Sequence, residues 1–160
     1  FAFSTSTALA ADRPSDQDVV RVVQQAASLL PPSDIPVKIF DPDKVKVNSA
    51  EERRFLKSIG GLVIPGERIV RMSTGGKNIE PASKGDEFAL YVLASELAHE
   101  YVHADQLGER EAFAKQEAVF QAFINTGKVD KAKGEKYLKE LRVIAESEIR
   151  REEARKTNQR

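Results

Sequence analysis

The sequence contains no cysteine and only two histidines among its 160 residues. The lack of cysteine excludes disulfide bonds and thiolate chemistry, so a metal site would need histidine and carboxylate ligands. Acidic and basic residues balance at 25 each, and this balance does not suggest a basic surface of the kind that binds nucleic acid. No run of 18 apolar residues occurs, so no segment is predicted to span a membrane.

The length fits a single domain, which we place at residues 11–149. Residues 1–10 are small and apolar, and Ala8-Leu9-Ala10 has the small-x-small form of a signal-peptidase site. We therefore expect residues 1–10 to be the remnant of an export signal and the protein to be periplasmic or secreted. The alternative is a disordered N-terminus. Residues 150–160 are highly charged, and we expect a disordered tail there.

Hydrophobic periodicity predicts an α+β fold with a small sheet ahead of its most apolar helix. That helix, over residues 87–107, is expected to be the central buried element and to end or bend at Gly108. The polar, glycine-containing segment 74–87 before it is predicted to be a loop. The other predicted helices cover residues 18–30, 50–59, 109–124 and 131–149, and the strands cover 35–40, 61–64 and 68–73.

Both histidines lie in the predicted central helix, four residues apart. His99 and His103 are therefore one turn apart on the same face, where both rings can bind one ion. Glu100 is about 100° around the helix, where it reaches a water molecule on the ion but does not share the coordination. This spacing predicts a zinc site with Glu100 as the general base. The alternative is that both histidines are ordinary core residues.

A third protein ligand must be a carboxylate, because no further histidine or cysteine exists. The helix over residues 109–124 offers Glu109, Glu111 and Glu117. Helical periodicity places Glu109 in the middle of the apolar face, Glu117 at its edge and Glu111 towards solvent. A carboxylate amid apolar side chains is costly unless it is neutralised, so Glu109 is the first choice. Glu117 remains the alternative, because a tight antiparallel hairpin would bring it level with the histidines.

The string His99-Glu100-Tyr101-Val102-His103, followed by Glu109-Arg110-Glu111-Ala112, resembles the zinc-binding motifs of zincin metallopeptidases of the gluzincin type. The resemblance covers residues 60–125. It implies a zincin-like fold in which a small β-sheet precedes a buried active-site helix and a second helix bears a ligand; a charged C-terminal helix would follow here. It also implies that an edge strand binds substrate in an extended form, and residues 68–73 are in that position.

By this resemblance the chain is a zinc-dependent hydrolase of peptide bonds, acting on a peptide or protein substrate. Its Zn2+ ligands are then His99, His103 and Glu109, with Glu117 as the alternative to Glu109. A second hypothesis is a non-catalytic zincin-like metal-binding scaffold, which the small size and the charged C-terminal helix favour. A third is a helical interaction module without metal.

Overall fold

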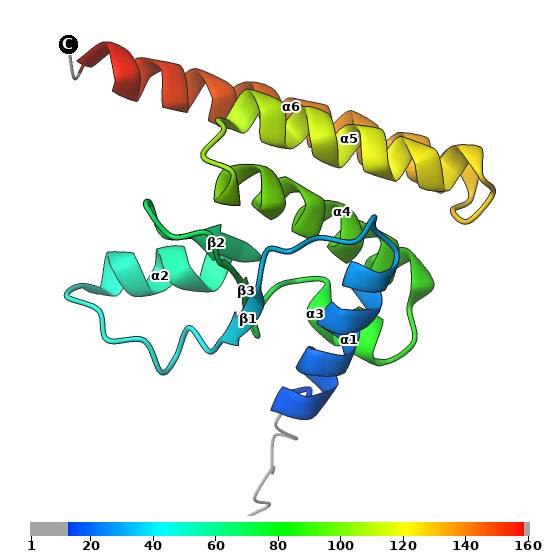
Figure 1. The fold of residues 1–160 in the computed structure, drawn as a ribbon, viewed down its shortest axis with the longest axis horizontal. Helices are drawn as coiled ribbons and strands as arrows, with labels where there is room; N and C mark the ends of the chain where they lie inside the picture. Colours follow the sequence, from blue (N-terminus) through cyan, green and yellow to red (C-terminus); the bar gives the residue numbers. More distant parts are fainter. Residues whose placement is uncertain (1–12, 159–160) are drawn as a thin grey trace, which may run out of the picture.

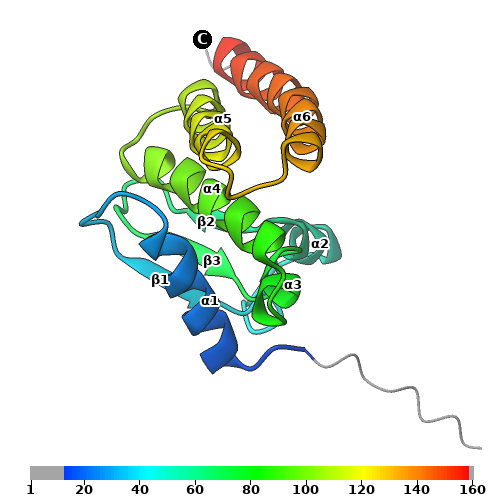
Figure 2. The ribbon, with the colours of Figure 1, turned by 90° about the vertical axis from the view of Figure 1, so that its right-hand side faces the viewer.

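Helix α4 (Glu87–Ala104) lies at the centre of the fold, between a layer that contains the sheet and a layer of two long helices (Figures 1 and 2). The structure is a computed structural model and describes residues 13–158. Within these residues it has six helices and one three-stranded sheet, so the predicted α+β class is confirmed. In chain order the other elements are α1 (Asp16–Ser28), β1 (Val37–Phe40), α2 (Ala50–Ser58), β2 (Gly61–Val63), β3 (Val70–Ser73), α3 (Ile79–Ser83), α5 (Glu109–Asn125) and α6 (Lys131–Asn158).

The strands form a mixed sheet in the order β1-β3-β2. β1 runs parallel to β3, whereas β2 runs antiparallel to it, with Gly61 opposite Met72. The chain reverses between β2 and β3 at Pro65–Gly66, where Gly66 has a φ of 84°. β3 is therefore the central strand, and the prediction that residues 68–73 form the substrate-binding edge is wrong. Among the described strands, β2 is the edge strand nearest to the C-terminal half of α4.

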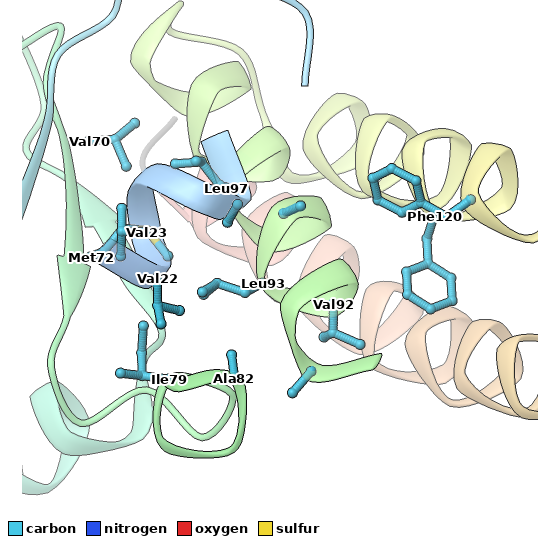
Figure 3. Close-up of a cluster of buried hydrophobic side chains, with 14 of the residues drawn as sticks. Val22, Val23, Val70, Met72, Ile79, Ala82, Val92, Leu93, Leu97 and Phe120 are labelled. Carbon is cyan, nitrogen blue, oxygen red and sulfur yellow. The ribbon is translucent and has the colours of Figure 1, made fainter. Parts of the chain in front are cut away.

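Apolar side chains pack on both sides of α4, as expected for the central buried element (Figure 3). On one side, Leu93 and Leu97 belong to a cluster with Met72 of β3 and Ile79 of α3. On the other side, Phe120 of α5 lies between α4 and α6, and it is completely buried. Because both faces of α4 are covered, a polar residue on this helix must find a partner or a cavity.

Capping side chains determine where the first and the central helix begin. Ser15 accepts a hydrogen bond from the Asp18 backbone N–H at the start of α1. Asp86 accepts one from the Ala89 N–H at the start of α4. α4 ends at Ala104, three residues before the predicted end, and Gly108 is the N-cap of α5 rather than the end of α4.

Two segments differ from the predictions. The predicted loop at residues 74–87 contains α3, because the apolar side chain of Ile79 enters the core and is fully buried there. Residues 150–158, for which a disordered tail is predicted, continue α6. Residues 1–10, the predicted remnant of an export signal, lie outside the described part of the chain. No helix within residues 13–158 is both long and apolar enough to cross a membrane.

Candidate metal centre

Three side chains from α4 and α5 meet beside the edge of the sheet: His99, His103 and Glu109. The Nε2 atoms of the two imidazoles lie 3.0 Å apart. Glu109 Oε2 lies 3.5 Å from each of them. The side chains of His99, His103 and Glu109 are 12%, 22% and 30% exposed, so the cluster is shielded but still reached by solvent. Helical spacing brings both rings to one point, and the next helix supplies a carboxylate there.

The carboxylate beside the histidines is that of Glu109 and not that of Glu117. Glu117 lies further along α5, where its Oε1 accepts hydrogen bonds from Arg142 of α6 at 2.5 and 2.8 Å. Glu111 is exposed. Although α5 runs back along α4 (Figure 1), the chain turns so sharply that the first residue of α5 already reaches the imidazoles.

The turn between α4 and α5 determines where this carboxylate lies. Gln106 has a φ of 65°, in the left-handed region that few residues other than glycine adopt. The Leu107 N–H donates to the Val102 carbonyl at 3.2 Å, and the Gln106 N–H donates to the His103 carbonyl at 2.9 Å. These two bonds form a Schellman helix end. Gly108 follows in an extended conformation, so the reversal occurs two residues before the glycine.

Hydrogen bonding leaves one nitrogen of His103 available to an ion. Its Nδ1 lies 3.1 Å from the Leu107 carbonyl oxygen, and because a carbonyl only accepts, Nδ1 carries the hydrogen. In the neutral imidazole the lone pair is then on Nε2, which faces His99 and Glu109. The His99 ring packs edge-to-face on Phe113, with centroids 4.6 Å apart. Its Nδ1 is buried without a hydrogen-bond partner within residues 13–158.

The three ligand atoms fit a tetrahedral zinc ion. Nitrogen and oxygen ligands at about 2.0 to 2.2 Å from zinc are about 3.3 to 3.6 Å from one another in a tetrahedron. The separations here are 3.0, 3.5 and 3.5 Å. Two histidines and one glutamate also form the donor set of many catalytic zinc sites, which keep the fourth position open for water or substrate.

The charges of the cluster depend on one another. Hydrogen bonding to Glu109 raises the pKa of His103 to about 9. In turn, hydrogen bonding to His103 and His99 holds the pKa of Glu109 far below its ordinary value. Without an ion, the carboxylate is therefore neutralised by a proton on His103 at neutral pH. A divalent cation competes with that proton, because a metal ligand must be a deprotonated imidazole.

Glu100 lies beside the same cluster in a different environment. Burial raises the pKa of its carboxyl above the ordinary value. Gly61 of β2 packs directly against it, because a Cβ on Gly61 would lie 3.0 Å from both Glu100 Cγ and Met72 Sδ. Glycine thus permits a close approach of the edge strand to the carboxyl group. A raised pKa makes a carboxylate a stronger proton acceptor, which suits a general base.

A groove of about 820 Å³ passes over the cluster. One of its walls contains β2 and the turn after it, together with Phe55 of α2 and Leu107 of the α4–α5 turn. Phe55 and Leu107 are 61% and 52% exposed, so this wall is apolar and accessible. The opposite wall belongs to α6, which contributes Glu148 and Arg155. The groove therefore joins an apolar edge strand to a charged helix across the candidate metal centre.

The C-terminal part of α6 also supports the start of α5. Gly108 has no side chain to cap that helix. Instead, the carboxylate of Glu152 accepts a hydrogen bond of 3.1 Å from the Glu109 backbone N–H, where the helix dipole favours negative charge. Arg110 pairs with Glu153 at 2.8 Å. A segment predicted to be a tail thus holds the end of α5 that bears the carboxylate.

Three residues at the site are absent from the sequence prediction. Gly61 was predicted only as the first residue of a strand, although a Gly-Gly pair at the start of a strand also fits a close backbone approach. Glu96 lines a hollow beside Glu100 and His99. It had a visible signal, because it is one turn before Glu100 in the most apolar helix of the chain. Glu152 had none, because it stands among other charged residues and meets α5 only through tertiary structure.

Comparisons with protein family models, with curated proteins and with solved structures found no match to this chain. The case for a metal centre therefore depends on three observations made in this chain alone. They are the converging imidazoles, the carboxylate of Glu109 between them, and a hydrogen bond that directs the lone pair of His103 into the cluster.

Proposed function

We propose that the chain is a zinc-dependent hydrolase of peptide bonds with a zincin-like site. The observation that carries the proposal is the cluster of His99, His103 and Glu109, which offers three ligand atoms at the spacing of a tetrahedral ion. A structural zinc site normally has four protein ligands, whereas a catalytic one has three. The three ligands, together with the accessible groove over them, favour catalysis over a purely structural ion.

Each residue of the site has a task in this proposal. His99, His103 and Glu109 would hold the zinc ion, which supplies Lewis acidity that makes water nucleophilic near neutral pH and polarises a carbonyl. Glu100 would take a proton from the attacking water and deliver it to the leaving amine. Burial raises the pKa of its carboxyl, so Glu100 gains a proton more readily than an exposed glutamate does.

The substrate in this proposal is a peptide in extended form along β2. β2 is at the edge of the sheet and its first residue packs against Glu100, so a peptide added as a further strand would pass the general base. The apolar wall around Phe55 and Leu107 would receive apolar side chains of that peptide. Export of the protein, predicted from residues 1–10, remains a prediction.

Metal analysis and peptide digestion test the proposal together. The untagged protein should bind about one zinc ion per chain and cleave members of a random peptide library. Chelation should abolish cleavage and added zinc should restore it, whereas His103→Ala should neither bind zinc tightly nor cleave. Protein that holds zinc but cleaves nothing would support the metal-binding scaffold. Protein that binds no zinc, with an unchanged melting temperature when zinc is added, would support the interaction module.

A further inference from the structure

A second hollow opens from the same site, on the side of Glu100 that faces α6. This recess has a volume of about 290 Å³. It shares His99, Glu100 and Gly61 with the groove, so a substrate that reaches the general base also reaches the mouth of the recess. Its volume is at the lower limit of ligand pockets, which suits one side chain rather than a larger molecule.

Glu96 is a polar side chain deep in this recess. It precedes Glu100 by one turn of α4, and it retains partial solvent exposure only because the recess reaches it. Asn78 donates a hydrogen bond of 2.8 Å to its Oε1. Its Oε2 faces Gly60, where an added Cβ would still lie 3.6 Å away. Within residues 13–158 no lysine or arginine forms an ion pair with this carboxyl group.

A carboxyl group in such a place favours a cationic guest. Burial raises the pKa of the Glu96 carboxyl, because the ionised form is costly away from water. An ammonium or guanidinium group that enters the recess would favour the ionised form and pair with it. Glu140, exposed at the rim, adds a second acidic group. The basic lining residue Lys77 is exposed. Its charge lowers the pKa of Glu96, but within the described chain it forms no ion pair with that carboxyl group.

The remaining walls suit the alkyl part of a long basic side chain. Leu141 and Ile144 of α6 and Phe113 of α5 line the recess with apolar surface. Tyr137 is fixed there because its hydroxyl accepts a hydrogen bond of 3.1 Å from Gln116. Lysine and arginine match this lining, because their apolar stems can lie against the apolar walls while the charged head reaches Glu96.

We propose that the recess binds the side chain of a lysine or arginine next to the scissile bond, with its cationic head on Glu96. This inference rests on the hydrolase proposed above, because it names the substrate residue which that site selects. The simpler role for Glu96 is to hold Asn78 at the start of α3. Glu96→Gln separates the two roles, because a glutamine oxygen still accepts the bond from Asn78 while the charge is lost.

Binding is tested first, with probes that contain no bond to hydrolyse. Zinc-loaded protein is titrated with n-pentylammonium chloride and with pentan-1-ol, following the NMR signal of the Gln116 side-chain amide. The ammonium probe should shift this signal, and Glu96→Gln should weaken its binding at least tenfold. Glu87→Gln, a charge loss on the exposed start of the same helix, should leave it unchanged. Equal binding of the alcohol, or an unchanged affinity in Glu96→Gln, would overturn the proposal.

Cleavage is tested second, with peptides that differ only in having lysine or norleucine next to the scissile bond. The lysine peptide should be the better substrate, and Glu96→Gln should lower its kcat/KM at least tenfold while changing that of the norleucine peptide less than twofold. Cleavage without a preference for lysine would refute the recess and leave the hydrolase intact. Selective binding of the ammonium probe without cleavage of any peptide would refute the hydrolase and leave the recess intact.

Discussion

Two glutamates of the candidate site, Glu109 and Glu100, lie in opposite electrostatic environments. Glu109, on α5, faces two imidazoles that hold its pKa far below the ordinary value. Glu100, on α4, is covered by the edge strand, and burial raises its pKa. The difference arises because hydrogen bonds from potential cations favour the ionised form, whereas desolvation penalises it.

This contrast supports the different tasks that we propose for two glutamates nine positions apart. A carboxylate that stays ionised is suited to hold a cation, and a carboxyl that gains a proton readily is suited to transfer one. The sequence motif alone predicts these roles from helical spacing. The structure adds a physical reason for each role, because Glu109 faces two imidazoles and Glu100 is covered by β2. Substitution of Glu100 should therefore affect catalysis, and substitution of Glu109 should affect metal binding.

Removal of the general base should have the largest effect. Glu100→Gln should lower kcat/KM for a cleaved peptide by about 10² to 10⁴, the contribution typical of positioned proton transfer. Zinc content should stay near one ion per chain, because Glu100 does not belong to the ligand cluster. Peptide kinetics and metal analysis of the same preparations measure both quantities, with Glu87→Gln as the matched control. Retention of full activity in Glu100→Gln would contradict the catalytic role proposed for Glu100.

Removal of the carboxylate ligand should act on the metal instead. Glu109→Ala should lower zinc affinity by roughly 100-fold or more, since even residues that only support a ligand contribute about 10- to 100-fold. The matched control is Glu117→Ala on the same helix, which loses only a surface ion pair with Arg142 and should bind zinc normally. Competition with a chromogenic chelator measures both affinities. A larger loss in Glu117→Ala would make Glu117 the ligand.

As the pH rises, the stability of the metal-free protein should fall, whereas its affinity for zinc should increase. In the folded metal-free protein His103 has a pKa of about 9, against about 6.5 when unfolded. The stabilisation from its proton is therefore complete below about pH 6.5 and disappears as the pH rises through about 9. Since zinc must displace this proton, zinc affinity should rise by about tenfold per pH unit over the same range.

Thermal unfolding at pH 6.5 and 9 checks this prediction. The metal-free protein should lose on the order of 2 kcal/mol of stability between these values, whereas the stabilisation produced by added zinc should increase. His103→Asn should remove most of the loss seen without metal. A zinc affinity that is constant across the range would show that no proton is displaced from the cluster.

A substitution in the edge strand β2 should affect catalysis through Glu100 and leave zinc binding unchanged. In Gly61→Ala the new methyl group would meet Glu100 Cγ and Met72 Sδ at 3.0 Å, so the carboxyl group or the strand must shift. We expect kcat/KM to fall by about tenfold, because small displacements of a catalytic group are costly, while zinc content stays unchanged. Gly75→Ala, which lies outside both hollows, is the control, because its Cβ would make only an ordinary contact at 3.5 Å. Equal effects of the two substitutions would argue against a specific contact at Gly61.

The sequence predicted those parts of the site that depend on one helix. His99 and His103 need only the geometry of a single turn of α4. Glu109 was the first choice because a carboxylate on an apolar face requires neutralisation, and the structure places it at the histidines. Each of these inferences used local periodicity and an energetic cost, and neither required knowledge of the tertiary fold.

The strand order and the C-terminal contacts depended on tertiary structure. β2 and β3 are three and four residues long, and their composition does not reveal which of them has neighbours on both sides. Residues 150–158 lack a strong apolar pattern, so their charges read as a solvated tail. Their order in the structure comes with contacts to α5, which is distant in sequence. A single sequence carries little information about such pairings.

The smallest expected effect concerns the turn between α4 and α5. Gln106 adopts a left-handed conformation, which costs about 1 kcal/mol for a residue with a side chain. Gln106→Gly should stabilise the metal-free protein by about 0.5 kcal/mol after the greater chain entropy of glycine is included. Gln106→Val should destabilise it by about 1 to 2 kcal/mol, because a β-branched residue tolerates this conformation poorly.

Zinc affinity makes this last pair of variants informative about the site. The turn positions both the Leu107 carbonyl that orients His103 and the start of α5 that bears Glu109. Zinc should therefore bind normally to Gln106→Gly and more weakly to Gln106→Val, as measured by chelator competition at a temperature where both are folded. If zinc affinity were equal in both variants, the carboxylate of Glu109 would not depend on the geometry of this turn.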